Sequence, residues 1–310
     1  MQRASLALNN LDGIIPDELG RLSALDLLNL YSNNLSGMVP EQLYNISSLN
    51  TLSLAENQLT GPLPRYIGST LPNLQNLYLG RNQFFGHIPE SFVNCSGLVD
   101  IDLAYNALTG PIPNNLGNLQ NLERINFGSN PLGDENGSDL TFLTSLTNCS
   151  NLRLVCFYKN RLTGVLPISI ANLSTNLYWL QLHTNYLTGN IPVEIENLKN
   201  LEYLALAGNM LTGRLPDSIG KLSKLQQLYK ACPPDSEVST IITLHDFLGF
   251  SHSHKIPQQW PFCYGESKLV VQDPSLDSSQ NVVLVKTVAI LTTKKEVDAS
   301  VHENNLMQSY

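Results

Sequence analysis

Long apolar stretches, a leader-like N-terminus and an excess of basic residues are all lacking in this sequence of 310 residues. No run of about 18 apolar residues occurs, so no segment is predicted to cross a membrane as a helix. The first six residues lack the basic and then apolar pattern of a secretory signal peptide. The formal net charge is −8, whereas proteins that bind a phosphate backbone usually carry a basic face. These absences argue against a nucleic-acid-binding protein and against a membrane segment in this chain.

Cysteine is also scarce, with five residues and no pair at the spacing of a zinc site. This low density excludes a small domain stapled by disulfides. Cys95 and Cys149 occupy equivalent places in two Asn-Cys-Ser segments, and we expect both to be small buried hydrophobic residues. A histidine-rich segment fits no closed zinc pattern, although it contains His245, His252, His254 and Cys263. The sequence therefore predicts no metal site and no cofactor.

Catalytic motifs are missing as well. The sequence has no Gly-x-Ser-x-Gly elbow, no phosphate loop, and neither the His-Arg-Asp nor the Asp-Phe-Gly motif of kinases. Asp100 and Asp102 are two residues apart, so they lie on one face of a strand, and a pair of carboxylates can hydrolyse glycosides. An open sheet, however, offers no pocket to raise either pKa, and Arg124 is predicted beside Asp100. A solvated ion-pair cluster is the preferred interpretation, and we do not expect an enzyme.

Asparagine, by contrast, is abundant, and it divides the chain near Lys230. Residues 1–229 hold 30 of the 33 asparagines, while four of the six histidines lie in residues 230–310. The pattern of the first segment stops at residues 230–234 and does not resume. We expect residues 1–229 to form one folded unit. For residues 230–310 we expect a poorly ordered tail, with a small module of unrecognised type as the alternative.

The first segment is periodic. An asparagine recurs every 24 or 25 residues, with one interval of 30 between Asn130 and Asn160. A pair of apolar residues in the pattern Leu-x-Leu precedes each asparagine, and an apolar residue follows two positions after it. Nine repetitions of this pattern make a strong repeat signal. The ladder asparagines are Asn9, Asn33, Asn57, Asn82, Asn106, Asn130, Asn160, Asn185 and Asn209.

Each position of the repeat has a physical role. The Leu-x-Leu pair predicts a short strand with leucines facing inward and the intervening residues facing solvent. The asparagine amide can both donate and accept, so a column of asparagines can satisfy backbone groups of neighbouring repeats. Gly permits the next bend, and Pro ends further pairing because it lacks an N–H. One repeat cannot bury its leucines alone, so stacking is required to make a continuous core.

The run Leu-Thr-Gly-x-Ile-Pro, seen at residues 108–113 and 187–192, resembles the plant-specific class of leucine-rich repeats. That class occurs in receptor-like kinases, receptor-like proteins and polygalacturonase inhibitors. The unit after Asn130 is longer and lacks the Gly-x-Ile-Pro segment. It looks like a long repeat of subfamily XII receptor kinases, the group with the flagellin receptor and the rice bacterial-blight receptors. The resemblance implies an α/β leucine-rich-repeat solenoid, a curved right-handed stack of about nine 24-residue repeats with a parallel strand face.

The resemblance also implies a function. The parent family sits in the plasma membrane with its repeats outside the cell, binds a peptide or protein ligand together with a co-receptor, and signals in defence. We expect this chain to be a truncated ectodomain fragment of such a receptor-like serine/threonine kinase. The alternatives are a soluble or secreted protein that binds or inhibits an enzyme, as polygalacturonase inhibitors do, and a non-functional truncated product.

Two kinds of site are predicted on this solenoid. Asn-x-Ser sequons, which accept glycans, lie at Asn34, Asn45, Asn94, Asn136, Asn148 and Asn172. Four of them share one phase of the repeat, on the outer side and away from the strands. Ligand contacts are predicted on the strand face, where exposed aromatic and charged residues commonly anchor partners. These residues are Tyr78, Asp100, Asp102, Tyr105, Arg124, Tyr158, Trp179, His183 and Tyr203.

Overall fold

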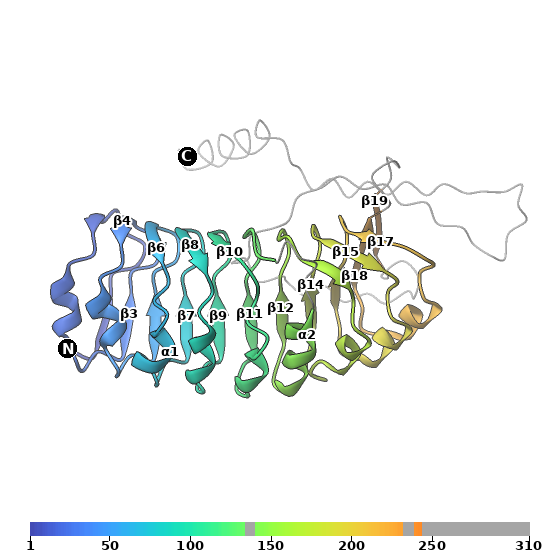
Figure 1. Ribbon diagram of the computed structural model, residues 1–310, viewed down its shortest axis with the longest axis horizontal. Helices are drawn as coiled ribbons and strands as arrows, with labels where there is room; N and C mark the ends of the chain where they lie inside the picture. The colour runs from blue at the N-terminus through green and yellow to red at the C-terminus, as the bar shows by residue number, and fades with distance from the viewer. Residues whose placement is uncertain (134–139, 232–238, 244–310) are drawn as a thin grey trace, which may run out of the picture.

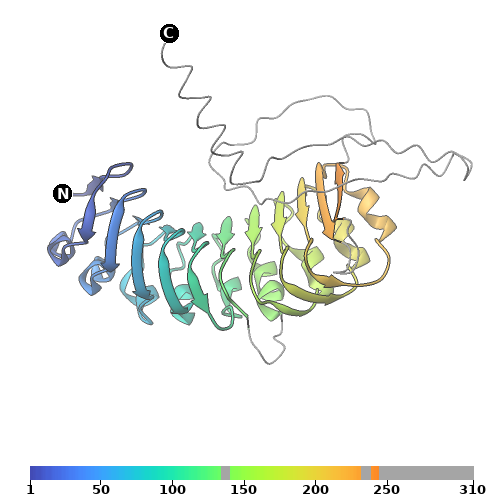
Figure 2. The ribbon, with the colours of Figure 1, turned by 90° about the horizontal axis from the view of Figure 1, so that it is seen from above.

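The computed structural model of the chain describes residues 1–133, 140–231 and 239–243. The predictions for Asn136, for the histidine-rich segment and for most of the tail lie outside these residues. The described part is an arc of stacked coils with one long sheet on its inner side, so that the strand face is concave (Figures 1 and 2). No helix among the described residues has the length and apolar character that a membrane crossing requires.

The concave sheet has eleven strands, ten of them parallel and the last antiparallel to its neighbour. Neighbouring strands pair in register one repeat apart, so that Leu28, for example, lies beside Leu52. The inward leucines of these strands are buried, as the repeat pattern predicts; Leu52 and Leu54 are both 0% exposed. The strands are β1 (Arg3–Ser5), β3 (Leu27–Asn29), β5 (Thr51–Ser53), β7 (Asn76–Tyr78), β9 (Asp100–Asp102), β11 (Arg124–Asn126), β12 (Leu154–Cys156), β14 (Trp179–Gln181), β16 (Tyr203–Ala205), β18 (Gln227–Ala231) and β19 (Ser239–Thr243).

A second row of strands follows the ladder asparagines on one flank of the arc, in two shorter parallel sheets. Gly37, at φ 76°, shows why this row needs glycine: a Cβ there would lie 2.9 Å from Cγ2 of Ile14 in the preceding repeat. The five-stranded sheet contains β2 (Asp12–Ile14), β4 (Asn34–Met38), β6 (Gln58–Pro62), β8 (Gln83–His87) and β10 (Ala107–Thr109). The three-stranded sheet contains β13 (Thr163–Val165), β15 (Tyr186–Gly189) and β17 (Met210–Leu211).

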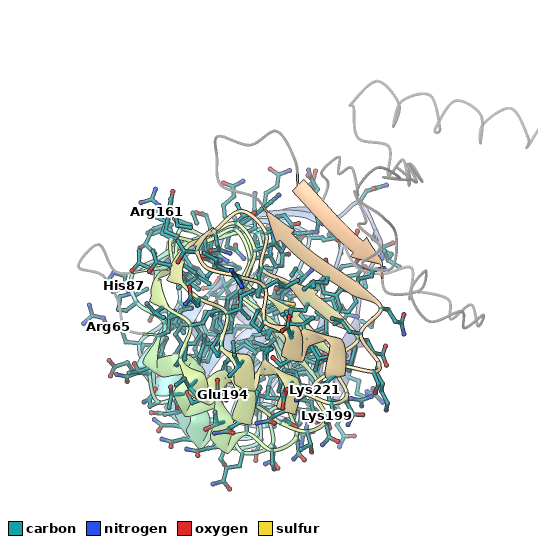
Figure 3. All side chains as sticks on the ribbon, turned by 90° about the vertical axis from the view of Figure 1, so that its right-hand side faces the viewer. Arg65, His87, Arg161, Glu194, Lys199 and Lys221 are labelled. Atoms are coloured by element: carbon teal, nitrogen blue, oxygen red, sulfur yellow. The ribbon has the colours of Figure 1, made fainter. Side chains whose placement is uncertain are left out.

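Short helical turns form the outer side of the arc, and most of them follow a proline that ends the second row of strands. Pro16, Pro40 and Pro89, for example, each cap a 3-10 helix with φ near the value that the ring imposes. The outer turns are η1 (Asp17–Arg21), η2 (Glu41–Asn45), α1 (Ile67–Thr70), η3 (Glu90–Asn94), η4 (Leu116–Asn118), α2 (Thr141–Ser145), η5 (Leu146–Asn148), η6 (Ile168–Asn172), η7 (Val193–Asn197) and η8 (Asp217–Lys221). Seen from the C-terminal end, Glu194 of η7 and Lys221 of η8 lie on the outer side of the stack, and Lys199 lies just after η7 (Figure 3).

The asparagine ladder ties successive repeats together. Asn57 is representative: its Nδ2 donates to the carbonyls of Leu30 in the preceding repeat (3.0 Å) and of Leu54 in its own repeat (3.1 Å). Its Oδ1 accepts the backbone N–H of Leu35 at 3.0 Å. The same pattern of bonds runs from Asn33 to Asn209, so each amide satisfies backbone groups of two repeats at once.

The long repeat after Asn130 is accommodated by α2 and a cluster of phenylalanines. Phe157 meets Phe142 of α2 and Phe127, which directly follows β11, edge-on, with ring centroids 4.8 and 5.6 Å apart. All three rings are buried in the large hydrophobic core that runs through the described repeats. Cys95 and Cys149 are buried in the same core, as predicted, and their thiols face the carbonyls of Leu71 and Leu116.

Candidate ligand-binding face

A charged network lies at the middle of the concave face, across β7, β9 and β11. The Asp100 carboxylate accepts a hydrogen bond from the Tyr78 hydroxyl at 2.8 Å and one from Arg124 Nε at 2.7 Å. A second Arg124 nitrogen lies 2.5 Å from the same oxygen. The register places Arg124 directly beside Asp100, on parallel strands about 4.8 Å apart, whereas Tyr78 lies beside Asp102 and reaches Asp100 diagonally.

The predicted ion pair of Asp100 with Arg124 is present, but the expectation that the cluster is solvated and raises no carboxyl pKa is wrong. Asp100 is only 5% exposed, and its ion pair with Arg124 and the hydrogen bond from Tyr78 compensate the burial. Burial raises the pKa of Asp102 to about 6, and the neighbouring Asp100 carboxylate adds to this rise. The hydrogen bonds from the backbone of Ala104 and the side chain of Asn126 oppose it. Side chains one strand away on either side enclose these carboxyl groups, which a flat open sheet would leave in water.

A second polar group on this face was not identified from the sequence. Arg81 Nε lies 3.6 Å from Glu56 Oε1, and its guanidinium carbon lies 4.5 Å from the centre of the Tyr105 ring. Each of these residues directly precedes a ladder asparagine, and each has a φ close to +55°. Positive φ is uncommon for residues other than glycine. The repeated position one residue before each ladder asparagine is the sequence signal that could have revealed this row.

Aromatic rings continue the face toward the C-terminal end. Tyr158 stacks on His183 with ring centroids 5.1 Å apart and meets Tyr105 edge-on at 6.1 Å. Trp179 stacks on Tyr203 at 3.8 Å, with the rings 5° from parallel. Burial, with a smaller contribution from Lys159, lowers the pKa of His183 to about 4, so this ring is neutral at ordinary pH.

The expectation that all nine predicted ligand contacts face solvent is therefore wrong at four of them. Asp100, Tyr158, His183 and Tyr203 are all at most 8% exposed, because rings and charges one strand apart cover each other. The remaining five are partly exposed: Tyr78, Asp102, Tyr105, Arg124 and Trp179. Two of these five, Tyr105 and Trp179, pack against the cluster around Tyr158.

The described sequon asparagines are all exposed. Asn45, Asn94, Asn148 and Asn172 each form the last residue of an outer 3-10 helix, away from the strand face. Asn34 differs, because it lies in β4 and its side-chain oxygen accepts a hydrogen bond from Gln58. The geometry leaves room for a glycan at the four outer positions without covering the concave face.

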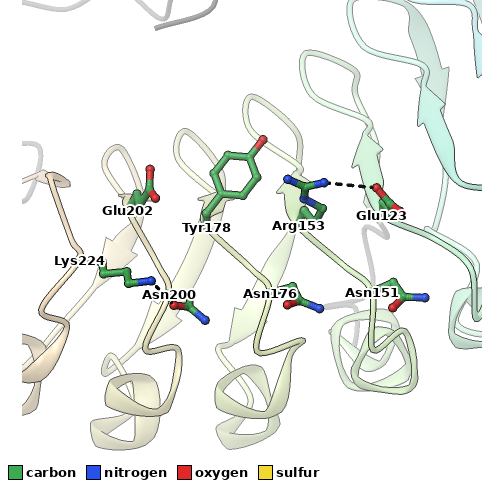
Figure 4. A pocket seen from close by; sticks show the side chains of 8 residues that line it. All are labelled: Glu123, Asn151, Arg153, Asn176, Tyr178, Asn200, Glu202 and Lys224. Atoms are coloured by element: carbon green, nitrogen blue, oxygen red, sulfur yellow. Dashed lines mark hydrogen bonds and ion pairs between the residues drawn. The ribbon is translucent and has the colours of Figure 1, made fainter. Parts of the chain in front are cut away.

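A polar hollow of about 530 Å³, which we call the lateral hollow, was not predicted from the sequence. It lies where the chain leaves the outer turns and enters the strands of five consecutive repeats (Figure 4). Its lining consists of Glu123, Asn151, Arg153, Asn176, Tyr178, Asn200, Glu202 and Lys224. These residues are separated by whole repeats, so their proximity emerges only once the repeats are stacked.

Among the described residues, no group of three or more His, Cys, Asp or Glu side chains could hold a metal ion. The chain matches family models described as leucine rich repeat over residues 72–132, 48–70 and 200–222. These matches fall on the repeats whose strands and ladder asparagines are described above. The chain is a leucine-rich-repeat protein.

Relatives of this leucine-rich-repeat protein are plant receptor kinases. A putative receptor-like protein kinase of Arabidopsis thaliana is 62% identical over 137 residues, which are 44% of this chain and 13% of that kinase. The receptor kinase-like protein Xa21 of Oryza sativa subsp. japonica is 41% identical over 90 residues, 29% of this chain and 9% of Xa21. The matched stretches thus span about a tenth of these kinases, and they confirm the resemblance to this group of receptors.

Solved structures show the same solenoid. The Arabidopsis receptor kinase HAESA, in complex with the peptide hormone IDA and the co-receptor SERK1, has a TM-score of 0.64 at 30% identity. The similarity covers 78% of this chain and 39% of that one. PEPR1 with AtPEP1 has a TM-score of 0.61 at 36% identity, over 73% of this chain and 34% of that one. A plant ice-binding protein scores 0.61 at 32% identity, over 70% and 67% respectively.

Proposed function

We propose that this chain binds a peptide or protein ligand along its concave strand face. It would do so as part of the extracellular region of a plant receptor-like serine/threonine kinase that perceives a signal in defence. The kinase relatives, and the complexes of HAESA and PEPR1 with IDA and AtPEP1, support this function. The co-receptor and the kinase activity belong to the proposal for the whole parent protein.

The observation that carries the proposal is the prearranged set of aromatic and charged side chains on the concave face. Tyr78, Asp102, Tyr105, Arg124 and Trp179 are partly exposed and would touch the ligand. The four buried neighbours would act as positioning residues: Asp100 holds Arg124 and Tyr78, while the rings beside Tyr105 and Trp179 hold those two side chains. Side chains that are already ordered lose less conformational entropy on binding, which raises affinity and specificity.

Selection of ligands tests this function. A random peptide library displayed on phage would be selected against the full 310-residue chain. We expect peptides whose binding falls about tenfold or more in Tyr105→Ala and Arg124→Gln, as for anchor residues of an interface. Val165→Ala on the second row of strands is the control, because this side chain is 59% exposed and lies on the flank. Selected peptides that bind both concave-face variants as well as the parent chain would refute the proposal.

The alternative function, inhibition of an enzyme by a soluble relative of polygalacturonase inhibitors, rests on the same face. An assay of enzyme inhibition distinguishes the two functions. If the chain abolishes the activity of a fungal polygalacturonase, and Arg124→Gln restores it, the inhibitor function is favoured over signal perception.

Glycosylation of the outer turns is part of the proposal. When the chain is directed through the secretory pathway of a plant cell, we expect glycans at Asn45, Asn94, Asn148 and Asn172. Intact-mass measurement before and after glycosidase treatment would count them. Replacement of the serine two residues after each asparagine by alanine should remove one glycan each, and an unchanged mass in those variants would contradict the assignment.

A further inference from the structure

The lateral hollow is separate from the concave face and is built from a different part of the repeat. Its floor carries the amides of Asn151, Asn176 and Asn200, one per repeat (Figure 4). Each amide nitrogen donates to a backbone carbonyl of the preceding repeat, at 3.5, 3.3 and 2.6 Å. These bonds fix the orientation of the amides. Among the described residues no donor bonds to the Oδ1 atoms of Asn151 and Asn176, so both remain able to accept a hydrogen bond.

The wall of the hollow combines opposite charges with one aromatic ring. Arg153 lies between Glu123, 3.7 Å from its carboxylate, and the Tyr178 ring, 6.0 Å from its centre. Glu202 directly precedes the next strand, β16, and Lys224 donates to Asn200 Oδ1 at 2.7 Å. Two carboxylates thus face two cations, and the formal charge of the lining is zero.

The polar and charge-balanced lining of the lateral hollow favours some classes of ligand over others. An apolar small molecule requires a largely hydrophobic pocket, and a protein interface requires an apolar centre depleted in charge. A polyanion would be repelled by the two carboxylates as strongly as it is attracted by the two cations. A polyhydroxylated ligand fits best, because each hydroxyl both donates and accepts, and the amides, carboxylates and guanidinium supply the complementary groups.

We propose that the lateral hollow is a binding site for a neutral oligosaccharide. The apolar C–H face of a sugar ring would lie against Tyr178, between Arg153 and Glu202. Hydroxyl groups would bond to the Oδ1 atoms of the floor amides. The hollow extends over five repeats, so it accepts several sugar units in a row rather than one. This site is independent of the peptide-binding function proposed for the concave face.

Binding measurements on the unglycosylated full chain test the site. Neutral hexasaccharides of glucose, mannose and xylose would be titrated by calorimetry, with hexagalacturonic acid as the anionic counterpart. We expect at least one neutral sugar to bind, and its Kd to rise about tenfold in Tyr178→Ala, as for the loss of one aromatic contact. Glu202→Gln provides a second variant, because this side chain is exposed and its substitution leaves the fold unchanged.

Tyr186→Ala is the matched control, since Tyr186 is 49% exposed but lies on β15 on the other flank. The proposal is overturned if no neutral hexasaccharide binds, or if both hollow variants bind it as the parent chain does. Binding of hexagalacturonic acid alone, with an affinity that fades as salt is added, would also overturn it in favour of an anion site at Arg153 and Lys224. Because the peptide selection depends on other residues, either proposal can fail without the other.

Discussion

The side-chain amide of Asn130 is the most enclosed member of the asparagine ladder, at 4% exposed. Its Nδ2 donates to the carbonyls of Leu103, Phe127 and Gly128, and its Oδ1 accepts the N–H of Leu108 at 3.0 Å. No side chain without an amide can replace all four bonds. A buried backbone group that loses its hydrogen-bond partner costs free energy, so these amide bonds stabilise the stacking of neighbouring repeats.

We expect Asn130→Ala to lower the free energy of unfolding by about 3 kcal/mol, because several buried backbone groups lose their partner. Urea denaturation followed by circular dichroism measures this. Asn9→Ala is the control: Asn9 is exposed and bonds only to carbonyls of its own repeat, so its loss should cost less than about 1 kcal/mol. Equal costs at the two positions would show that the bonds between repeats do not matter.

Asp102 makes stability depend on pH in an unusual direction. Its folded-state pKa of about 6 lies above the value of about 3.9 in an unfolded chain. The folded state therefore binds the proton more tightly, and the stability that this group contributes is present at low pH and lost as pH rises from about 4 to about 6. A carboxylate held by ion pairs would instead contribute more stability as the pH rises.

The expected result is that the parent chain loses up to about 3 kcal/mol relative to Asp102→Asn between about pH 4 and pH 7. Asparagine keeps the oxygen that accepts the N–H of Ala104, so the comparison isolates the charge. Urea denaturation of both proteins at a series of pH values gives the difference. A difference that stays constant, or that grows in favour of the parent chain at higher pH, would show that the folded state does not raise the pKa of Asp102.

At the scale of the secondary-structure element, close contact between outer turns depends on glycine. A Cβ at Gly68 in α1 would lie 1.6 Å from the carbonyl oxygen of Ser91 in η3, whereas a Cβ at Gly220 in η8 would meet nothing within 4 Å. Neither residue has the positive φ that only glycine tolerates well. The two positions are equivalent in the repeat, so they form a matched pair.

We expect Gly68→Ala to destabilise the fold by about 2 kcal/mol or more, because backbone must move to admit the methyl group. Gly220→Ala should be neutral or stabilising by up to about 1 kcal/mol, because alanine lowers the entropy of the unfolded chain. Thermal and urea denaturation measure the change in stability of each variant. A similar effect of both substitutions would mean that the outer turns are not packed through Gly68.

The strands of the concave sheet could be predicted because alternation and spacing recur in every repeat. The second row of strands could not, since Leu-x-Gly segments such as 35–37 are too short to read as strands and pair only with a segment one repeat away. The stacking of Trp179 on Tyr203 and the burial of Asp102 depend likewise on neighbours in the next repeat. The residues of the concave face were therefore predictable by position, whereas their exposure and the lateral hollow were not.

At the scale of the whole molecule, contacts pass mainly between adjacent repeats, so a complete repeat can be removed without breaking the register. Deletion of residues 76–99 would bring Asp100 to the place of Asn76, its partner in the sheet. Deletion of residues 76–87 would instead join segments out of phase and expose core leucines.

We expect the chain without residues 76–99 to fold, with an urea m-value lower by about a tenth because one repeat of about ten is missing. The chain without residues 76–87 should lose cooperative unfolding. Circular dichroism during urea titration distinguishes the outcomes. A complete loss of structure after the whole-repeat deletion would contradict a stack of independent units.

The two short sheets of the flank also have a mechanical consequence. The concave sheet is continuous from β1 to β18. On the flank, the described residues link β10 to β13 through Leu132, which forms a bridge with Gly110 and whose carbonyl accepts the N–H of Arg161. The arc resists bending most where the concave sheet and a flank sheet are both continuous. Among the described residues, the link through Leu132 is where we expect the arc to flex most, which would let its concave face fit ligands of different curvature.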